Sequence, residues 1–137
     1  MTAAQTYRTF NAALAIGTLL LGLAAWSFTV TADGEGLIGI GGWRVPELCA
    51  TKRLTGRPCA SCNLARSVVL AVQGDVARSR AFHRGGVLVA GWLALHVLLR
   101  ALGAFRPPAP RFWRLDLALT ALSLLVLLLA VLAQPPN

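Results

Sequence analysis

Residues 10–30 read FNAALAIGTLLLGLAAWSFTV and contain no charged side chain. A helix rises about 1.5 Å per residue, so about 20 apolar residues cross a hydrocarbon core roughly 30 Å thick. This stretch therefore predicts a membrane-spanning helix. A secretory signal peptide is the competing interpretation. The apolar stretch is longer than a typical signal core of about 15 residues, and residues 31–32 provide no convincing Ala-x-Ala cleavage site.

Two further apolar stretches of this length lie at residues 85–105 and 115–133. Of the 137 residues, 56% are hydrophobic and 13% are charged, whereas soluble domains carry about 25% charged residues. The chain is too short to add a separate soluble domain to the three spans. We therefore expect an all-α membrane protein that forms a single domain over residues 1–137, with spans at about residues 10–31, 85–105 and 115–133.

The segment between the first two spans, residues 32–84, does not have the composition of a span. It opens with five glycines that favour turns: Gly34, Gly36, Gly39, Gly41 and Gly42. The apolar residues 64–72 would make a helix of about 14 Å, which is too short to cross the bilayer. This predicts one short interfacial or re-entrant helix, ended by Gly74 and followed by a segment that Asp75 caps.

The net charge of +8 comes mostly from arginines that flank the spans. Such arginines meet anionic lipid headgroups, so membrane lipids are the expected partners. No basic helix with interleaved aromatic residues is present, and nucleic-acid binding is not expected. Both sides of the membrane would hold several basic residues, so the positive-inside rule leaves the orientation open.

Three cysteines follow the spacing Cys49-x9-Cys59-x2-Cys62. A gap of two residues places two sulfur atoms near one point, which suits a metal ion such as zinc or iron, or a redox dithiol. A tetrahedral metal site would need a fourth ligand, which His83 or Asp75 could supply. The odd number also fits one disulfide with a free thiol, and a disulfide or packed-thiol staple would hold the loop together without any activity. The residues leave these three alternatives open.

Arg66 follows Cys62 by four residues, so both side chains could share one face of the short helix. A pair with Asp75 would lower the cost of keeping both charges near lipid. If Arg66 instead binds a ligand, a lipid phosphate is the first candidate, because the planar guanidinium matches phosphate oxygens.

His96 lies inside the second span, where ionisable residues are functional candidates. It could ligate a haem or chlorophyll metal or relay protons. Cofactor ligation is disfavoured, because no second histidine matches it and Trp92, one turn earlier, leaves little room for a flat macrocycle. Arg100, one turn later, is expected to extend toward the headgroups.

The cysteine segment carries a recognisable pattern. Residues 54–62 read LTGRPCASC, Gly74-Asp75 follows, and residues 82–86 read FHRGG. These motifs resemble those of a family of small bacterial membrane proteins classed as a domain of unknown function. Its pattern runs Cys-Pro, then Leu-Thr-Gly-x-Pro-Cys-Pro-x-Cys-Gly-x-Thr-Arg, then Gly-Asp, then Phe-His/Asn-Pro-x-Gly. The resemblance implies a multi-pass protein of the bacterial inner (cytoplasmic) membrane.

The chain departs from that pattern at several positions. Ala50, Ala60 and Arg84 stand in place of family prolines, Asn63 in place of a glycine, and Ala65 in place of a threonine. Asn63 could still cap the short helix, whereas the missing threonine hydroxyl removes any role beside the arginine. The family has no established activity, so the resemblance adds no reaction.

Catalytic templates are not met: the sequence has no phosphate-cradling loop, zinc-protease helix or serine nucleophile elbow. We therefore favour an accessory or scaffold subunit, packed among other membrane-protein subunits, over an enzyme. The alternative is a metal-binding or thiol redox protein that uses the three cysteines. Small-solute transport is a weaker third option, because three spans form no pore without oligomerisation.

Overall fold

The computed structural model describes residues 2–32, 34, 36–46, 54–56, 63–105 and 113–133 of the chain. Three long helices dominate this part: α1 (Ala3–Ser27), α5 (Gly85–Phe105) and α6 (Trp113–Leu132). All three are long and apolar enough to cross a membrane. The predicted all-α membrane protein with three spans is therefore confirmed, and α5 has the expected bounds.

The first span differs from the expected one at both ends. Its helix starts at Ala3 because Thr2 and Gln5 form a capping box: the Gln5 N–H donates to Thr2 Oγ1 at 3.3 Å, and the Thr2 N–H donates to Gln5 Oε1 at 2.7 Å. It ends at Ser27 because Phe28 adopts an extended conformation. The apolar residues after Phe28 leave the span and enter a small sheet.

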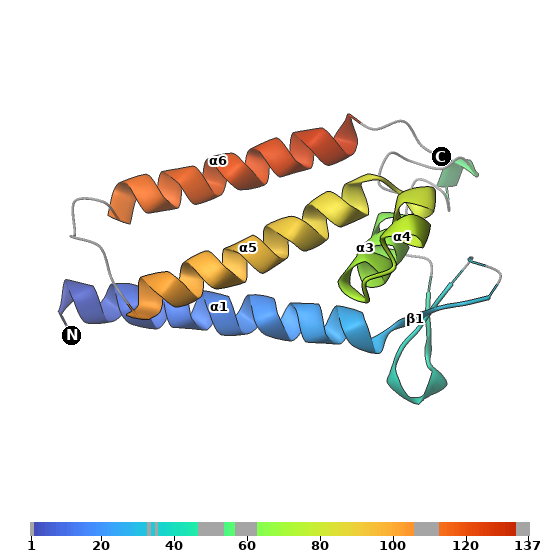
Figure 1. Ribbon diagram of the computed structural model, residues 1–137, viewed down its shortest axis with the longest axis horizontal. Coiled ribbons are helices and arrows are strands. Elements are labelled where there is room, and N and C mark those ends of the chain that lie inside the picture. The colour runs from blue at the N-terminus through green and yellow to red at the C-terminus, as the bar shows by residue number, and fades with distance from the viewer. Residues whose placement is uncertain are drawn as a thin grey trace.

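The three long helices lie side by side, with α5 between α1 and α6 (Figure 1). The N-terminal part of α1 lies near the end of α5, where the Arg8 guanidinium donates to the Phe105 carbonyl at 3.4 Å. Two short helices, α3 (Leu64–Val72) and α4 (Val76–Phe82), pack at the opposite end of the bundle, against the start of α5. The two short helices between the first two spans thus lie at one end of the bundle.

The short helix predicted at residues 64–72 is α3. Gly74, with a left-handed φ of 89°, follows its end, and Asp75 caps α4 by accepting from the Arg78 N–H at 3.0 Å. The stop and the cap were both expected from the sequence. Because α4 folds back on α3, the apolar stretch is one half of a helical hairpin.

A small antiparallel sheet, which the sequence analysis did not anticipate, follows α1. Its strands are β1 (Thr29–Val30), β2 (Leu37–Ile38) and β3 (Arg44–Val45). Thr29 pairs with Ile38, and Ile38 pairs with Arg44. Between β2 and β3 lies the single turn η1 (Ile40–Gly42), where Gly41 and Gly42 have φ values of 78° and 79°, a region that favours glycine.

A small core joins this sheet to the hairpin. Val30 of β1 packs with Val69 and Leu70 of α3, and all three side chains are buried. Phe28 and Phe82 are partly buried around them. The core fixes the end of α1, the sheet and the α3–α4 hairpin to one another.

Gln73, the C-cap of α3, also completes the end of α1. Its Nε2 donates to the carbonyl of Trp26 at 3.0 Å and to that of Phe28 at 2.7 Å. Carbonyls at a helix end have no partner within the helix, so a side-chain donor from outside stabilises that end.

Gln73→Glu is expected to lower the free energy of unfolding by about 1 kcal/mol, because the carboxylate keeps the shape but loses the donor. Titration with a denaturing detergent, followed by circular dichroism, measures the change. Gln5→Glu is the matched control: Gln5 uses its oxygen as an acceptor at a helix N-terminus, where a carboxylate is favourable. Equal destabilisation by the two variants would contradict the role of Gln73.

Candidate functional site

The three cysteines of the predicted site, Cys49, Cys59 and Cys62, lie outside the residues that the structure describes. The structure does describe the residues that follow them, from Asn63 to the start of α5. This part holds the other proposed participants, Arg66, Asp75 and His83.

The backbone at Asn63 is left-handed, with φ 67°. Among non-glycine residues asparagine adopts this conformation comparatively readily, which accounts for the glycine at this position in the pattern of the resembled family. Asn63 is the N-cap residue of α3, as expected, but its side chain makes no capping bond. Its Oδ1 instead accepts a hydrogen bond from Arg66 Nη1 at 2.8 Å.

Arg66 and Asp75 have different partners. Arg66 bonds to Asn63, whereas Asp75 forms an ion pair with Arg78 at 3.6 Å and caps α4. Both members of the Asp75–Arg78 pair are substantially exposed, so this pair adds little to stability. The structure thus gives Asp75 a role at the surface of the hairpin.

Two serines join α3 to α4 in the interior of the hairpin. Ser67 and Ser79 are fully buried and their hydroxyl oxygens lie 2.9 Å apart. Ser79 Oγ donates to the Ser67 carbonyl at 2.7 Å, and Ser67 Oγ contacts the carbonyls of Ser79 and His83. Gly86 of α5 packs directly on this pair, because a Cβ at that position would lie 2.7 Å from the Ser67 carbonyl carbon. The hairpin and α5 meet here without space for a side chain.

His83 is the best-defined member of the predicted site. Its side chain is 2% exposed, and Nδ1 accepts a hydrogen bond from the Gly85 N–H at 2.9 Å. An imidazole nitrogen that accepts carries no proton, so a neutral His83 has its proton on Nε2. In that tautomer Nε2 is a hydrogen-bond donor and has no lone pair for a metal ion. The local geometry therefore suits donation from His83 better than metal ligation.

His96 lies in the middle of α5 and stacks on Trp92, with ring centroids 4.7 Å apart and planes 13° from parallel. The indole N–H of Trp92 donates to Ser123 Oγ of α6 at 3.2 Å. Trp92 thus covers one face of the imidazole, the face that the sequence analysis expected it to block.

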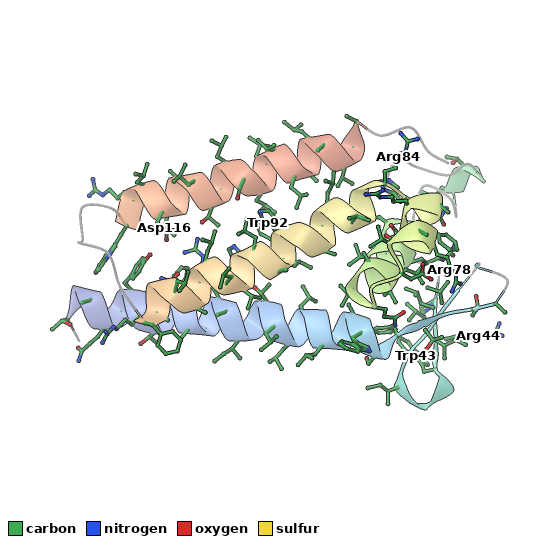
Figure 2. The ribbon with its side chains drawn as sticks, in the orientation of Figure 1. Trp43, Arg44, Arg78, Arg84, Trp92 and Asp116 are labelled. Atoms are coloured by element: carbon green, nitrogen blue, oxygen red, sulfur yellow. The ribbon has the colours of Figure 1, made fainter. Side chains whose placement is uncertain are left out.

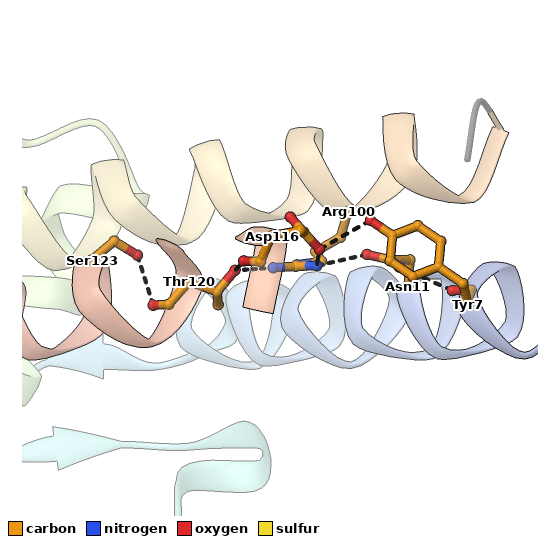
Figure 3. Close-up of polar contacts among 6 residues, drawn as sticks. All are labelled: Tyr7, Asn11, Arg100, Asp116, Thr120 and Ser123. Atoms are coloured by element: carbon orange, nitrogen blue, oxygen red, sulfur yellow. Dashed lines mark hydrogen bonds and ion pairs between the residues drawn. The ribbon is translucent and has the colours of Figure 1, made fainter. Parts of the chain in front are cut away.

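The main polar cluster of the spans centres on Arg100 and was not predicted from the sequence. Its guanidinium is 3% exposed and points between α1 and α6 (Figure 3). Nη1 donates to Asn11 Oδ1 of α1 at 2.8 Å and to Asp116 Oδ2 of α6 at 2.7 Å, and Nη2 bonds to Thr120 Oγ1. One arginine therefore connects all three spans.

Tyr7 completes this cluster. Its hydroxyl donates to Asp116 Oδ2 at 3.0 Å, its carbonyl accepts from Asn11 Nδ2 at 2.9 Å, and its ring stacks on Trp113 at a centroid distance of 4.9 Å. We call Tyr7, Asn11, Arg100 and Asp116 the polar clamp. In lipid no water is present to replace these partners, so the clamp fixes how the spans associate.

Arg100 was expected to extend toward the headgroups, and that expectation was wrong. The side chain is buried because a carboxylate and an amide lie within reach on the neighbouring helices. A signal was present: Arg100 precedes the end of α5 by five residues, and Asp116 follows the start of α6 by three. In consecutive antiparallel spans such positions lie at similar depth, so a charge pair could have been inferred.

In the described part of the chain, no group of three or more His, Cys, Asp and Glu side chains lies close enough to hold a metal ion. The buried polar groups gather instead at the polar clamp and at the serine pair, at opposite ends of the bundle. Both sets connect helices.

Together, the three apolar helices and their polar contacts define a small multi-pass membrane protein. A family model described as a protein of unknown function (DUF2752) matches residues 49–97, which is about a third of the chain. Comparison with curated proteins and with solved structures finds no match. The matched residues cover all three cysteines, α3, α4 and the first half of α5, and so include the two short helices at one end of the bundle.

Proposed function

We propose that this protein is a non-catalytic accessory subunit of a larger assembly in the bacterial inner membrane, and that its cysteines staple the loop between the first two spans. The use of the buried polar side chains carries this proposal. Five such residues occur in the described part of the chain: Asn11, Ser67, Ser79, His83 and Arg100. Each bonds to a neighbouring helix or to the turn between two helices. These buried polar groups join the helices into one support, which we call the platform.

The outer surface of the spans supports the same proposal. Of the residues in the apolar stretch of α6, only 6% are buried within the protein. In the corresponding stretches of α1 and α5 the share is 11%. Apolar helix faces of this kind contact either lipid or the helices of other subunits. The proposed platform would place the cysteine loop, and the segment that matches the family model, at one end of such an assembly.

Crosslinking in the native membrane, followed by purification in a mild detergent, tests the proposal. The tagged chain is expected to copurify with larger membrane proteins in a fixed ratio. The triple variant Cys49→Ser, Cys59→Ser, Cys62→Ser is expected to reduce the amount of that assembly, because the loop loses its staple. A chain recovered alone, crosslinked only to copies of itself, would contradict the accessory role.

A metal-binding or thiol redox protein is the second candidate. One observation favours it: α3 begins two residues after Cys62, and the free N–H groups of a helix start favour a thiolate nearby. The tautomer of His83 argues against that residue as the fourth metal ligand. Zinc or iron in an equimolar amount, in protein purified with reductant and without chelator, would favour this candidate over the first.

A further inference from the structure

An open apolar groove of about 640 Å³ lies between α1 and α5 and reaches α3 and the first residue of α4. Leu19 and Leu23 line it on α1, and Leu93 and Val97 line it on α5. Thr18 also lines the groove, but its hydroxyl already donates to the Leu14 carbonyl at 2.8 Å. The groove therefore suits a hydrocarbon occupant.

One end of the groove lies where α1 ends. Trp26, in the last turn of α1, lines one end and is 63% exposed. Tryptophan concentrates at the level of the lipid headgroups, so this end of the groove lies where phosphates are found. Trp43, Arg44 and Arg78 lie at the same end of the molecule, which supports that placement (Figure 2).

An exposed arginine follows the groove lining along α4. Val76 lines the groove, and Arg80 follows it by four residues on α4, so the two side chains share a helix face. Arg80 is exposed, and it has no hydrogen-bond or ion-pair partner among the residues that the structure describes. A guanidinium binds phosphate oxygens through two parallel hydrogen bonds.

We propose that this groove binds one acyl chain of an anionic phospholipid, whose phosphate is held by Arg80. The apolar walls match the chain, and Arg80, which has no partner among the described residues, matches the phosphate. A helix from another protein would fill the walls but would leave the arginine without a counter-charge. The proposal is independent of the accessory role, since a lipid site would serve a protein of any function.

Two glycines provide a matched pair of variants. Gly91 lines the groove, whereas Gly17 does not, and a Cβ at either position meets no atom within 4 Å. Gly91→Leu therefore places a side chain in the groove at a position where the added Cβ meets no atom, and Gly17→Leu adds the same side chain elsewhere. Arg80→Gln removes the proposed phosphate ligand. Arg84→Gln is its control, because Arg84 is exposed and lies toward α6 (Figure 2).

Native mass spectrometry of the delipidated full chain, titrated with phosphatidylglycerol or with phosphatidylcholine of the same acyl composition, measures binding. We expect Gly91→Leu to weaken the binding of both lipids at least tenfold. Arg80→Gln should weaken phosphatidylglycerol binding about fivefold, the effect of one arginine on an anionic lipid, and leave phosphatidylcholine binding unchanged. Neither control variant should alter binding of either lipid.

Two results would overturn the proposal. Unchanged lipid binding in Gly91→Leu would exclude the groove as the lipid site. Equal effects of Arg80→Gln and Arg84→Gln would show that any surface arginine attracts the anionic lipid and that Arg80 does not hold its phosphate. A third result would indicate that the groove is occupied by a helix of another protein and not by a lipid. In that case Gly91→Leu would release a protein crosslinked to the chain in the membrane and leave lipid binding intact.

Discussion

Replacing Gly86 with alanine is expected to separate α5 from the α3–α4 hairpin and to leave little folded protein in the membrane. An added Cβ would lie 2.7 Å from the carbonyl carbon of Ser67. A backbone atom cannot rotate away as a side chain can, so the two helices must move apart. The added Cβ would also overlap Ser67 Oγ, so that hydroxyl would lose its hydrogen bonds to Ser79.

Overpacking in a core costs about 1–3 kcal/mol, and we expect Gly86→Ala to reach at least the upper end of that range because the clash is with backbone. Denaturing-detergent titration of the purified protein measures the loss. The matched control is Gly91→Ala on the same helix, where a Cβ meets nothing within 4 Å. It should stabilise the protein by about 0.5–1 kcal/mol through helix propensity. Similar stabilities for the two variants would refute the close contact.

The second large effect is expected at the polar clamp, where the two halves of the ion pair are buried unequally. Arg100 is 3% exposed, whereas the side chain of Asp116 is 34% exposed. Asp116→Leu leaves a buried cation without its counter-charge and should lower the free energy of unfolding by about 3–5 kcal/mol. Arg100→Leu leaves a carboxylate that retains its bond from Tyr7 and lies in the first turn of α6, where the helix dipole favours a negative charge, so it should cost about 1–2 kcal/mol.

The double variant Arg100→Leu, Asp116→Leu removes both charges together. It should lie within about 2 kcal/mol of the wild type, the remaining loss coming from Asn11, whose Oδ1 then has no donor. Arg78→Leu is the control, because it breaks the exposed pair with Asp75 and should change stability by about 1 kcal/mol or less. A double variant that loses the sum of the two single losses would show that the charges act independently.

The spans could be predicted from the sequence because length and apolar composition are properties of one segment. Residues 85–105 form α5 and residues 64–72 form α3, as expected. Gly74 and Asp75 also act as predicted, because a helix stop and a helix cap depend on residues a few positions apart. The start of α1 was missed although its capping box, Thr2 and Gln5, is equally local.

The candidate site could be predicted only in part, because it depends on how separate segments meet. The burial of His83 and its bond to Gly85 arise where α4 turns into α5. Asn11, Arg100 and Asp116 are brought together by the register of three helices, which no single segment determines. The strands of the sheet are two residues long, too short to give a periodic signal. The roles predicted for the cysteines stay predictions.

The polar clamp also limits how the sequence of this protein can evolve. It takes residues from all three spans: Tyr7 and Asn11 from α1, Arg100 from α5 and Asp116 from α6. If a helix from another membrane protein replaced one span, the polar side chains of the clamp on the two remaining spans would lose their partners. Chimeras that exchange a single span should therefore fail, while exchanges of all three spans together should be tolerated. The three helices are therefore expected to evolve as one unit. A substitution in the clamp on one helix should be accompanied by a compensating substitution on another.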